Sequence, residues 1–278
     1  MDKISVLGKS SYIAGEFLKL YIDETVGINH RETKESPTNN IINFVSTTDN
    51  YWPTRGDLYQ DIQINLLYLM DFLNAAQRKY NNDFVFNQVS SWFVVGKVDK
   101  LPVDEQVHCN PNGFYAISKY ASELFLRSFC ETNNIRYRIL RLSNIYGKYD
   151  KGASLKKNTL HALVNMIKCN EDINLYDGGN VIRDYLYVTD CARAIKLVLD
   201  KGEFNTTYNI GSGKPRRFSD LILMARNMFH SSSRFINIDT PSFHSTIQTK
   251  DFYFNIDKLK QLGFEETTLI KDGIKSIL

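Results

Sequence analysis

The chain has 278 residues, of which 43% are hydrophobic and 23% charged, and its formal net charge is +3. This length and composition are typical of one large globular domain, or of one domain that carries a smaller lobe. The charge is small and no block of five like charges occurs, which argues against nucleic-acid binding. No apolar run approaches the roughly 20 residues that cross a bilayer, so no membrane partner is expected.

The cysteines and histidines show no metal-binding spacing. Cys109, Cys130, Cys169 and Cys191 are scattered, mostly within apolar segments, and are interpreted as buried reduced thiols. The N-terminal stretch MDKISVLGK lacks a secretory apolar segment. We therefore expect no metal site and a cytoplasmic protein, since reduced thiols suit that compartment.

Short β-rich runs alternate with helical patterns along the first half of the chain. Strands separated by helices of ten or more residues predict βαβ units and an α/β fold, a Rossmann-like doubly wound parallel sheet covered on both faces. In chain order, strands are predicted at 4–7, 25–28, 40–45, 83–90 and 137–143, and helices at 12–22, 61–80 and 118–134.

Two regions differ in pattern. Residues 1–147 are predicted to form a Rossmann-like domain, a fold typical of NAD(P)-binding domains, to which 181–204 return. Residues 148–278 are more irregular and are predicted to form mainly a smaller C-terminal lobe that binds substrate. Ligands of such sheets lie beyond the carboxyl ends of the strands, so the residues that follow each strand are the candidate site.

Tyr115 and Lys119 stand four residues apart in the helical stretch FYAISKYASE, which places both on one helical face. A nearby ammonium favours phenolate, so we expect the pKa of Tyr115 to lie below its ordinary value of about 10. Such a tyrosine is a plausible proton donor or acceptor toward a carbonyl or carbinol oxygen. Ser91, which follows a neighbouring strand, could hydrogen-bond the same oxygen.

Five ordered segments resemble the extended short-chain dehydrogenase/reductase family of nucleotide-sugar epimerases, dehydratases and reductases. They are VSSWFVVG, NPNGFYAISKYASE, RILRLSNIYGKY, LYDGGNVIRDYLYVTDCARAI and YNIGSGKPRRFSDLI. The resemblance implies that Ser91, Tyr115 and Lys119 are catalytic, that Asn144 faces the substrate and that Arg183 contacts substrate phosphate. Val95 stands where the family usually has tyrosine.

The N-terminal loop departs from this family. Its Gly-x-x-Gly-x-x-Gly fingerprint falls on Gly8, Ser11 and Ala14, so only the first glycine remains. Serine still offers a hydroxyl and the helix N-terminus still offers amides for phosphate. We therefore interpret the stretch as an altered phosphate loop rather than an ordinary turn. The residues expected at the cofactor from this loop and from the end of the third strand are Gly8, Ser10, Ser11, Tyr12, Ile13, Ser46 and Thr47, together with Tyr115 and Lys119.

The second strand is followed by Asn29, His30 and Arg31, where NAD-binding relatives carry an acidic residue. An arginine accommodates a ribose 2′-phosphate that a carboxylate would repel, so NADP(H) is favoured and NAD(H) is the alternative. A plain loop cation explains Arg31 as well. The strand and helix that the family usually has before residue 40 are absent from RETKESPTNN, which predicts a trimmed adenine pocket.

Members of this family catalyse dehydration, epimerisation or reduction of nucleotide sugars. Trp92 and Phe93 follow Ser91 and cannot transfer protons, which disfavours a dehydratase. We predict NADPH-dependent reduction of the C4 carbonyl of a nucleoside-diphosphate 4-keto-6-deoxy sugar, with Trp92 lining the sugar site or simply packing in the core. An NAD-dependent nucleotide-sugar 4-epimerase is the close alternative, and a non-catalytic nucleotide sensor is the distant one.

The expected partners follow from this interpretation. The substrate is a nucleoside-diphosphate sugar. A homodimer is expected by resemblance, through the helix after Asn65 and the helix around Tyr115. Burial within the monomer explains the apolar face of the former helix equally well.

Overall fold

The computed structural model describes residues 3–47, 59–155, 157–247 and 251–277. Its centre is a six-stranded parallel sheet with the strand order β10-β5-β4-β3-β1-β2. The α/β fold with a parallel sheet is therefore confirmed. The strands are β1 (Ile4–Leu7), β2 (Thr25–Ile28), β3 (Asn40–Asn43), β4 (Val85–Ser91), β5 (Arg136–Leu142) and β10 (Thr206–Ile210).

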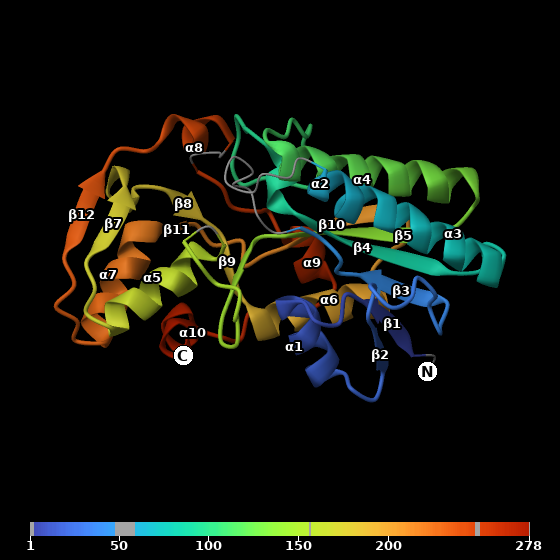
Figure 1. Cartoon of the computed structure of the whole chain (residues 1–278), viewed down its shortest axis with the longest axis horizontal. Coiled ribbons are helices and arrows are strands. Elements are labelled where there is room, and N and C mark those ends of the chain that lie inside the picture. The colour runs from blue at the N-terminus through green and yellow to red at the C-terminus, as the bar shows by residue number, and fades with distance from the viewer. Residues whose placement is uncertain (1–2, 48–58, 156, 248–250, 278) are drawn as a thin grey trace.

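Helices cover both faces of this sheet (Figure 1). On one face lie α1 (Tyr12–Leu20) and α6 (Val188–Lys201), and on the other lie α3 (Tyr68–Tyr80) and α4 (Phe114–Thr132). The short α2 (Gln60–Ile62) and a π-helical turn, η2 (Gln63–Leu67), lead into α3.

The strands read as nearly continuous apolar runs because their alternating side chains enter two different cores. On β1, Val6 packs in the cluster that contains Phe17 of α1, whereas Leu7 packs in the cluster that contains Phe72 of α3. Each strand is thereby fixed between two helical layers, and its carboxyl end stays at one edge of the sheet.

Residues 29–39 connect β2 to β3 without any helix or strand. Because β3 lies on the other side of β1 from β2, this connection passes the end of β1, and β2 is left as the edge strand. The short polar connection expected from the sequence is thus present.

The rest of the chain forms a lobe beside the carboxyl ends of the sheet strands (Figure 1). It is built from two-stranded ladders and short helices around a third apolar cluster. The ladders pair β6 (Asn144–Tyr146) with β9 (Tyr185–Tyr187), β7 (Ile173–Tyr176) with β12 (Phe235–Ile238), and β8 (Ile182–Arg183) with β11 (Arg216–Arg217). The helices of the lobe are α5 (Thr159–Lys168), η4 (Asp177–Gly179), α7 (Phe218–Met228), α8 (Ser242–Ile247) and α10 (Ile270–Lys275). Two further short helices, η3 (Trp92–Val95) and α9 (Asp257–Gln261), pack with the central sheet instead.

The chain returns to the sheet through α6 and β10, so the returning segment extends past residue 204 to Ile210. The division into two domains stays a prediction. The helix around Tyr115 begins at Phe114, earlier than the predicted start at residue 118.

All four cysteines are free thiols. Cys109, Cys130 and Cys191 are buried, but Cys169 is exposed just after α5, so the prediction of burial is wrong there. Cys169 ends an amphipathic helix, where the apolar pattern stops and the chain turns to solvent. In the described ranges, no helix combines the length and apolarity that a bilayer span requires.

Candidate active site

A large cavity of about 1490 Å³ lies between the carboxyl ends of the sheet strands and the C-terminal lobe. Pockets for one small ligand usually measure about 300–1,000 Å³, so this cavity has room for two ligands side by side. The sequence-predicted residues that line it are Ser10, Ser11, Tyr12, Ile13, Arg31, Ser46, Ser91, Trp92, Tyr115, Lys119, Asn144 and Arg183.

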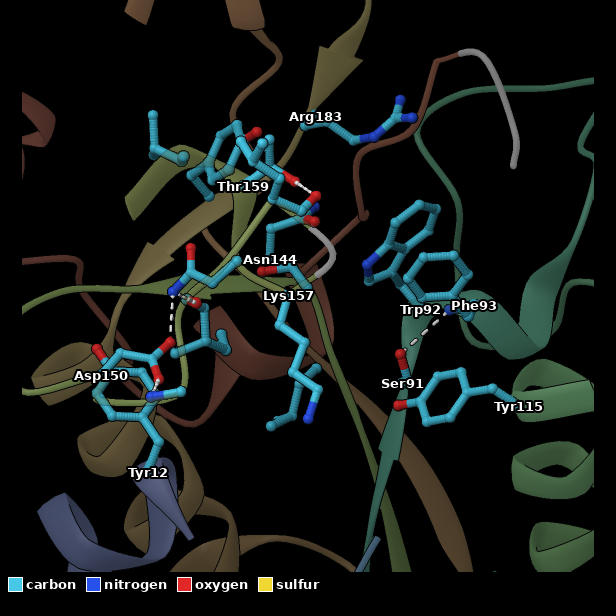
Figure 2. A pocket seen from close by; sticks show the side chains of 18 of the residues that line it. Tyr12, Ser91, Trp92, Phe93, Tyr115, Asn144, Asp150, Lys157, Thr159 and Arg183 are labelled. Atoms are coloured by element: carbon cyan, nitrogen blue, oxygen red, sulfur yellow. Dashed lines mark hydrogen bonds between the residues drawn. The ribbon is translucent and has the colours of Figure 1, made fainter. Parts of the chain in front are cut away.

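The hydroxyls of Ser91 and Tyr115 lie side by side on one wall of this cavity (Figure 2). Ser91 ends β4 and caps η3, where its Oγ accepts from the Phe93 amide at 3.3 Å. Tyr115 lies in the first turn of α4, beside the hydroxyls of Ser91 and Ser46. The end of a strand and the start of the next helix thus bring the two predicted groups together.

The pKa of Tyr115 differs from our expectation. Burial raises it above the ordinary value of 10, and the neighbouring hydroxyls of Ser91 and Ser46 offset that effect only in part. The prediction of a lowered pKa is therefore wrong for the protein alone. The helical spacing gave the right face for Lys119, but it said nothing of the desolvation of the phenol.

Lys119 is almost fully buried, and its Nζ donates to the carbonyl oxygen of Val89 at 2.7 Å. Burial lowers the pKa of this ammonium to about 8, although the carboxylate of Glu123 acts in the opposite direction. Since Lys119 also lines the cavity, its proton is available near neutral pH to a ligand bound there.

A buried ion pair joins β4 to the neighbouring elements. Glu123 lies one turn after Lys119 on α4, and Arg141 of β5 reaches it through Nη2 at 2.7 Å and Nε at 3.1 Å. The hydroxyl of Ser90, next to Ser91, donates to the same carboxylate. The pair therefore joins α4, β4 and β5 directly below the Ser91–Tyr115 pair.

Aromatic rings form the wall beside Ser91. The rings of Trp92 and Phe93 lie 4.1 Å apart, and Phe93 meets Tyr115 edge to face with centroids 5.9 Å apart. The guanidinium of Arg183 lies over Trp92, 5.3 Å from its ring centre (Figure 2). Trp92 is only 5% exposed yet lines the cavity, so it packs in the core as well.

The loop between β1 and α1 begins at Gly8, whose φ of +85° explains why glycine remains at this position. Ser11 is the N-cap of α1, and its Oγ accepts from the Ala14 amide at 3.3 Å. Ala14 is fully buried, so its methyl group fits where helix meets sheet. Ser10 and Ser11 line the cavity, so the positive end of α1 faces it, as a diphosphate requires.

The loop after β2 presents Arg31 to the cavity. Asn29 orders this loop by accepting from the Arg31 amide at 3.2 Å and donating to Glu32 at 2.6 Å. His30 packs against the ring of Tyr68. Burial and the neighbouring cations lower the pKa of His30, so we expect a neutral imidazole and leave the positive charge to Arg31.

Lys34 was not singled out in the sequence. Its ammonium lies 3.3 Å from the centre of the Tyr68 ring and donates to the carbonyl oxygen of His30 at 3.0 Å. It adds a second positive charge to the loop that carries Arg31. Only the fold could reveal it, because Tyr68 comes from a helix more than thirty residues later.

Four predicted cofactor residues do not line the cavity: Gly8, Asn29, His30 and Thr47. Gly8 and Asn29 shape the loops that do line it. Thr47 points into a buried network in which its hydroxyl donates to Asp61 and accepts from Asn65. A cofactor contact through the Thr47 hydroxyl is therefore not supported by this geometry.

The C-terminal lobe completes the cavity. Asn144 lies at its edge, with the backbone amide and the side-chain amide both donating to the Asp184 carbonyl oxygen. Lys157 extends into the cavity (Figure 2). Its neighbour Lys156, the other half of a basic pair in the sequence, lies outside the described residues.

The profile of the NAD dependent epimerase/dehydratase family matches residues 21–211. A candidate UDP-glucose 4-epimerase of Methanocaldococcus jannaschii is 30% identical over 220 residues, which are 78% of this chain and 69% of that protein. A trifunctional UDP-glucose 4,6-dehydratase/3,5-epimerase/4-keto-rhamnose-reductase of Arabidopsis thaliana is 21% identical over 97% of this chain, which spans less than half (45%) of that protein's length.

Solved structures show the same fold. RMD from Pseudomonas aeruginosa, complexed with NADPH, is similar with a TM-score of 0.86 and 21% identity, over 100% of this chain and 97% of that one. UDP-glucose 4-epimerase from Thermotoga maritima, with UDP-glucose, is similar with a TM-score of 0.87 and 18% identity, over 99% and 97% of the two chains.

Proposed function

The chain belongs to the NAD-dependent epimerase/dehydratase family, and from that premise we propose that it is an NADPH-dependent reductase acting on the C4 carbonyl of a nucleoside-diphosphate 4-keto-6-deoxy sugar. The observation that carries the choice of reduction is the loop after β2, which presents Arg31 to the cavity and suits NADPH, the cofactor that a reductase consumes. Burial also favours the protonated form of Tyr115, from which the carbonyl oxygen would receive its proton.

The part of the cavity next to the sheet would hold a dinucleotide. Ser10, Ser11 and the N-terminus of α1 would hold the diphosphate, and Arg31 would pair with a ribose 2′-phosphate. Glu32, the carboxylate of the same loop, is not among the lining residues and accepts from Asn29. This arrangement supports NADP(H) over NAD(H).

The nucleotide sugar would occupy the side of the lobe. Arg183 and Lys157 line this side and would pair with its diphosphate through charge-assisted hydrogen bonds. Asn144 and the rings of Trp92 and Phe93 would contact the sugar, and an apolar wall suits a 6-methyl group better than a 6-hydroxyl.

The residues then act as follows. A bound nicotinamide supplies the hydride that adds to the carbonyl carbon. Tyr115 donates its phenolic proton to the carbonyl oxygen, and Ser91 donates a hydrogen bond to that oxygen as charge develops on it. Tyr115 is left as a phenolate and regains a proton from water. Lys119 stabilises the phenolate and would bind the nicotinamide ribose.

An NAD-dependent nucleotide-sugar 4-epimerase is the second candidate, favoured by the 30% identity to the archaeal protein. An absorbance assay separates the two. Stoichiometric loss of the near-ultraviolet NADPH band with a 4-keto-6-deoxy sugar nucleotide supports the reductase. Cofactor retained through purification, together with C4 inversion of a UDP-hexose and no net loss of NADPH, supports the epimerase.

The Arg31→Ala variant tests the cofactor preference. We expect KM for NADPH to rise roughly tenfold, because one charge-assisted phosphate contact is lost, with KM for NADH nearly unchanged. Equal changes for both cofactors would contradict the role given to Arg31.

We also propose a homodimer through one face of the α2–η2–α3 and α4 helices. Ile62 and Leu67 on the first helical run are about half exposed, as are Ile117, Leu124 and Phe125 on α4. Large apolar side chains gathered on neighbouring helices are typical of a protein interface. Sedimentation of Ile117→Asp against wild type tests this, and a wild-type monomer would refute it.

A further inference from the structure

A buried carboxylate close to Tyr115 has no part in the reaction described above. Asp61, in the short helix α2, is only 3% exposed. The hydroxyl of Thr47 donates a short hydrogen bond to it. Burying a charged group is costly unless it is well hydrogen-bonded, so a carboxylate at this depth points to a specific role.

Asp61 is the start of a hydrogen-bonded network that ends on Tyr115. Asn65, one turn later, accepts from the Thr47 amide at 3.0 Å and donates both to the Thr47 hydroxyl and to the Ser118 hydroxyl at 2.8 Å. The Ser118 hydroxyl in turn donates to the backbone carbonyl oxygen of Tyr115 at 2.9 Å. The network therefore fixes the first turn of α4.

The same network also holds the residue beside the phenol. Ser46, whose hydroxyl lies near that of Tyr115, precedes Thr47 in the chain and donates to the Thr47 carbonyl oxygen at 2.6 Å. Thr47 is thus held by Asp61 and Asn65 through its side chain and by Ser46 through its backbone. A change at Asp61 is therefore transmitted to the first turn of α4 and to Ser46.

The charges around Tyr115 are unevenly placed. Asp61 faces it from α2, and its negative charge raises the pKa of Tyr115 further. On α4, the ammonium of Lys119 is bound to Val89 and Glu123 is paired with Arg141. The groups that face the phenol from β3, β4 and η3 are neutral: the hydroxyls of Ser46 and Ser91 and the ring of Phe93.

We propose that Asp61 is a positioning residue for Tyr115 that holds the Thr47–Asn65–Ser118 network beneath the first turn of α4. Its negative charge also favours the phenol form of Tyr115 over the phenolate. The consequence for the direction of the reaction rests on the proposed reductase function. A reductase starts each turnover from the phenol, whereas an epimerase starts by oxidising its substrate and needs a phenolate as the base. After each proton transfer, the charge of Asp61 favours return of a proton from water to the Tyr115 phenolate.

The ionisation of Tyr115 can be measured in the protein without cofactor. Tyrosines labelled with ¹³C at Cζ report phenolate by NMR, and the Tyr115→Phe variant assigns the signal. Near the ordinary tyrosine pKa of about 10, we expect the Tyr115 signal of Asp61→Asn to move toward the phenolate position, while wild type stays closer to phenol. Asp71→Asn, which removes an exposed carboxylate of α3, is the matched control and should behave as wild type.

Asp61→Glu keeps the charge and should give the wild-type signal. If Asp61→Asn does not fold, Asp61→Glu and Thr47→Val take its place. The proposal is then supported when Asp61→Glu matches wild type and the Tyr115 signal of Thr47→Val moves toward phenolate. A Tyr115 signal that is unchanged in Asp61→Asn, or in Thr47→Val, overturns it.

Turnover gives a second readout. In Asp61→Asn the alkaline limb of the kcat profile should move to lower pH with KM unchanged, so that the loss is about threefold greater at pH 9 than at pH 7. An equal loss at every pH would mean a merely structural role and overturn the proposal. If no variant reduces any keto-sugar, the proposed function fails, while the NMR signal still decides the role of Asp61.

Discussion

Replacing Glu123 by glutamine removes one half of the buried ion pair that joins α4, β4 and β5. The Glu123 and Arg141 side chains are 1% and 4% exposed, and Arg141 holds the carboxylate through two nitrogens while Ser90 donates to it as well. Glutamine keeps the size of the side chain, so the change reports the charge and not a cavity. The guanidinium of Arg141 would be left buried without its counter-charge.

Removing one partner of such a buried pair typically costs about 3–5 kcal/mol of unfolding free energy. A domain of ordinary stability has about 5–15 kcal/mol in total, so this single substitution consumes a large share. Equilibrium urea unfolding of wild type and Glu123→Gln measures the difference directly. Asp83→Asn is the matched control: its pair with Arg136 spans 3.9 Å and both side chains are more than half exposed, so we expect less than about 0.5 kcal/mol.

A double variant, Glu123→Leu with Arg141→Leu, distinguishes an uncompensated charge from lost packing. Replacing both charges by apolar groups should recover much of the stability that the single change loses. A Glu123→Gln protein within about 1 kcal/mol of wild type would refute the reasoning. A double variant no more stable than the single one would show that packing, and not charge, decides the effect.

Three further predictions follow from the site. Tyr115→Phe removes the proposed proton donor and should lower kcat by roughly 10²–10⁴ while substrate affinity stays within about twofold, as steady-state kinetics and calorimetry would show. A non-catalytic sensor would show no turnover to lose, and its ligand binding would barely change. The pKa of Lys119 is lowered from 10.5 to about 8, so the unfolded chain binds more protons than the folded one between these pH values. The unfolding free energy of wild type should therefore rise by up to about 3 kcal/mol relative to Lys119→Met as pH rises through that window, as urea unfolding would show. Gly96→Ala places a methyl group against the Asn110 carbonyl oxygen at a φ of +73°, so thermal unfolding should show a loss of roughly 2–4 kcal/mol of unfolding free energy. The control Gly15→Ala adds a methyl group that meets nothing within 4 Å and should not destabilise the protein.

The sequence by itself determined the order of strands and helices and the meeting of Ser91 with Tyr115. Alternating apolar runs and helical patterns leave few topologies for a parallel sheet, and in all of them the carboxyl ends of the strands meet at one edge. The end of β4 and the start of α4 therefore lie at the same edge of the sheet. The short connection between β2 and β3 was equally legible, because residues 29–39 carry no apolar period.

Only the tertiary structure decided the chemistry of these groups. The spacing of Tyr115 and Lys119 fixes a shared helical face, but a pKa depends on desolvation and on charges that arrive from other elements. Asp61 comes from α2, and the carbonyl of Val89 that holds Lys119 comes from β4. Such contacts join residues tens of positions apart, and no local period of the chain encodes them. Thr47 turned inward for the same reason, because Asn65 and Asp61 offered its hydroxyl partners that the sequence does not place beside it.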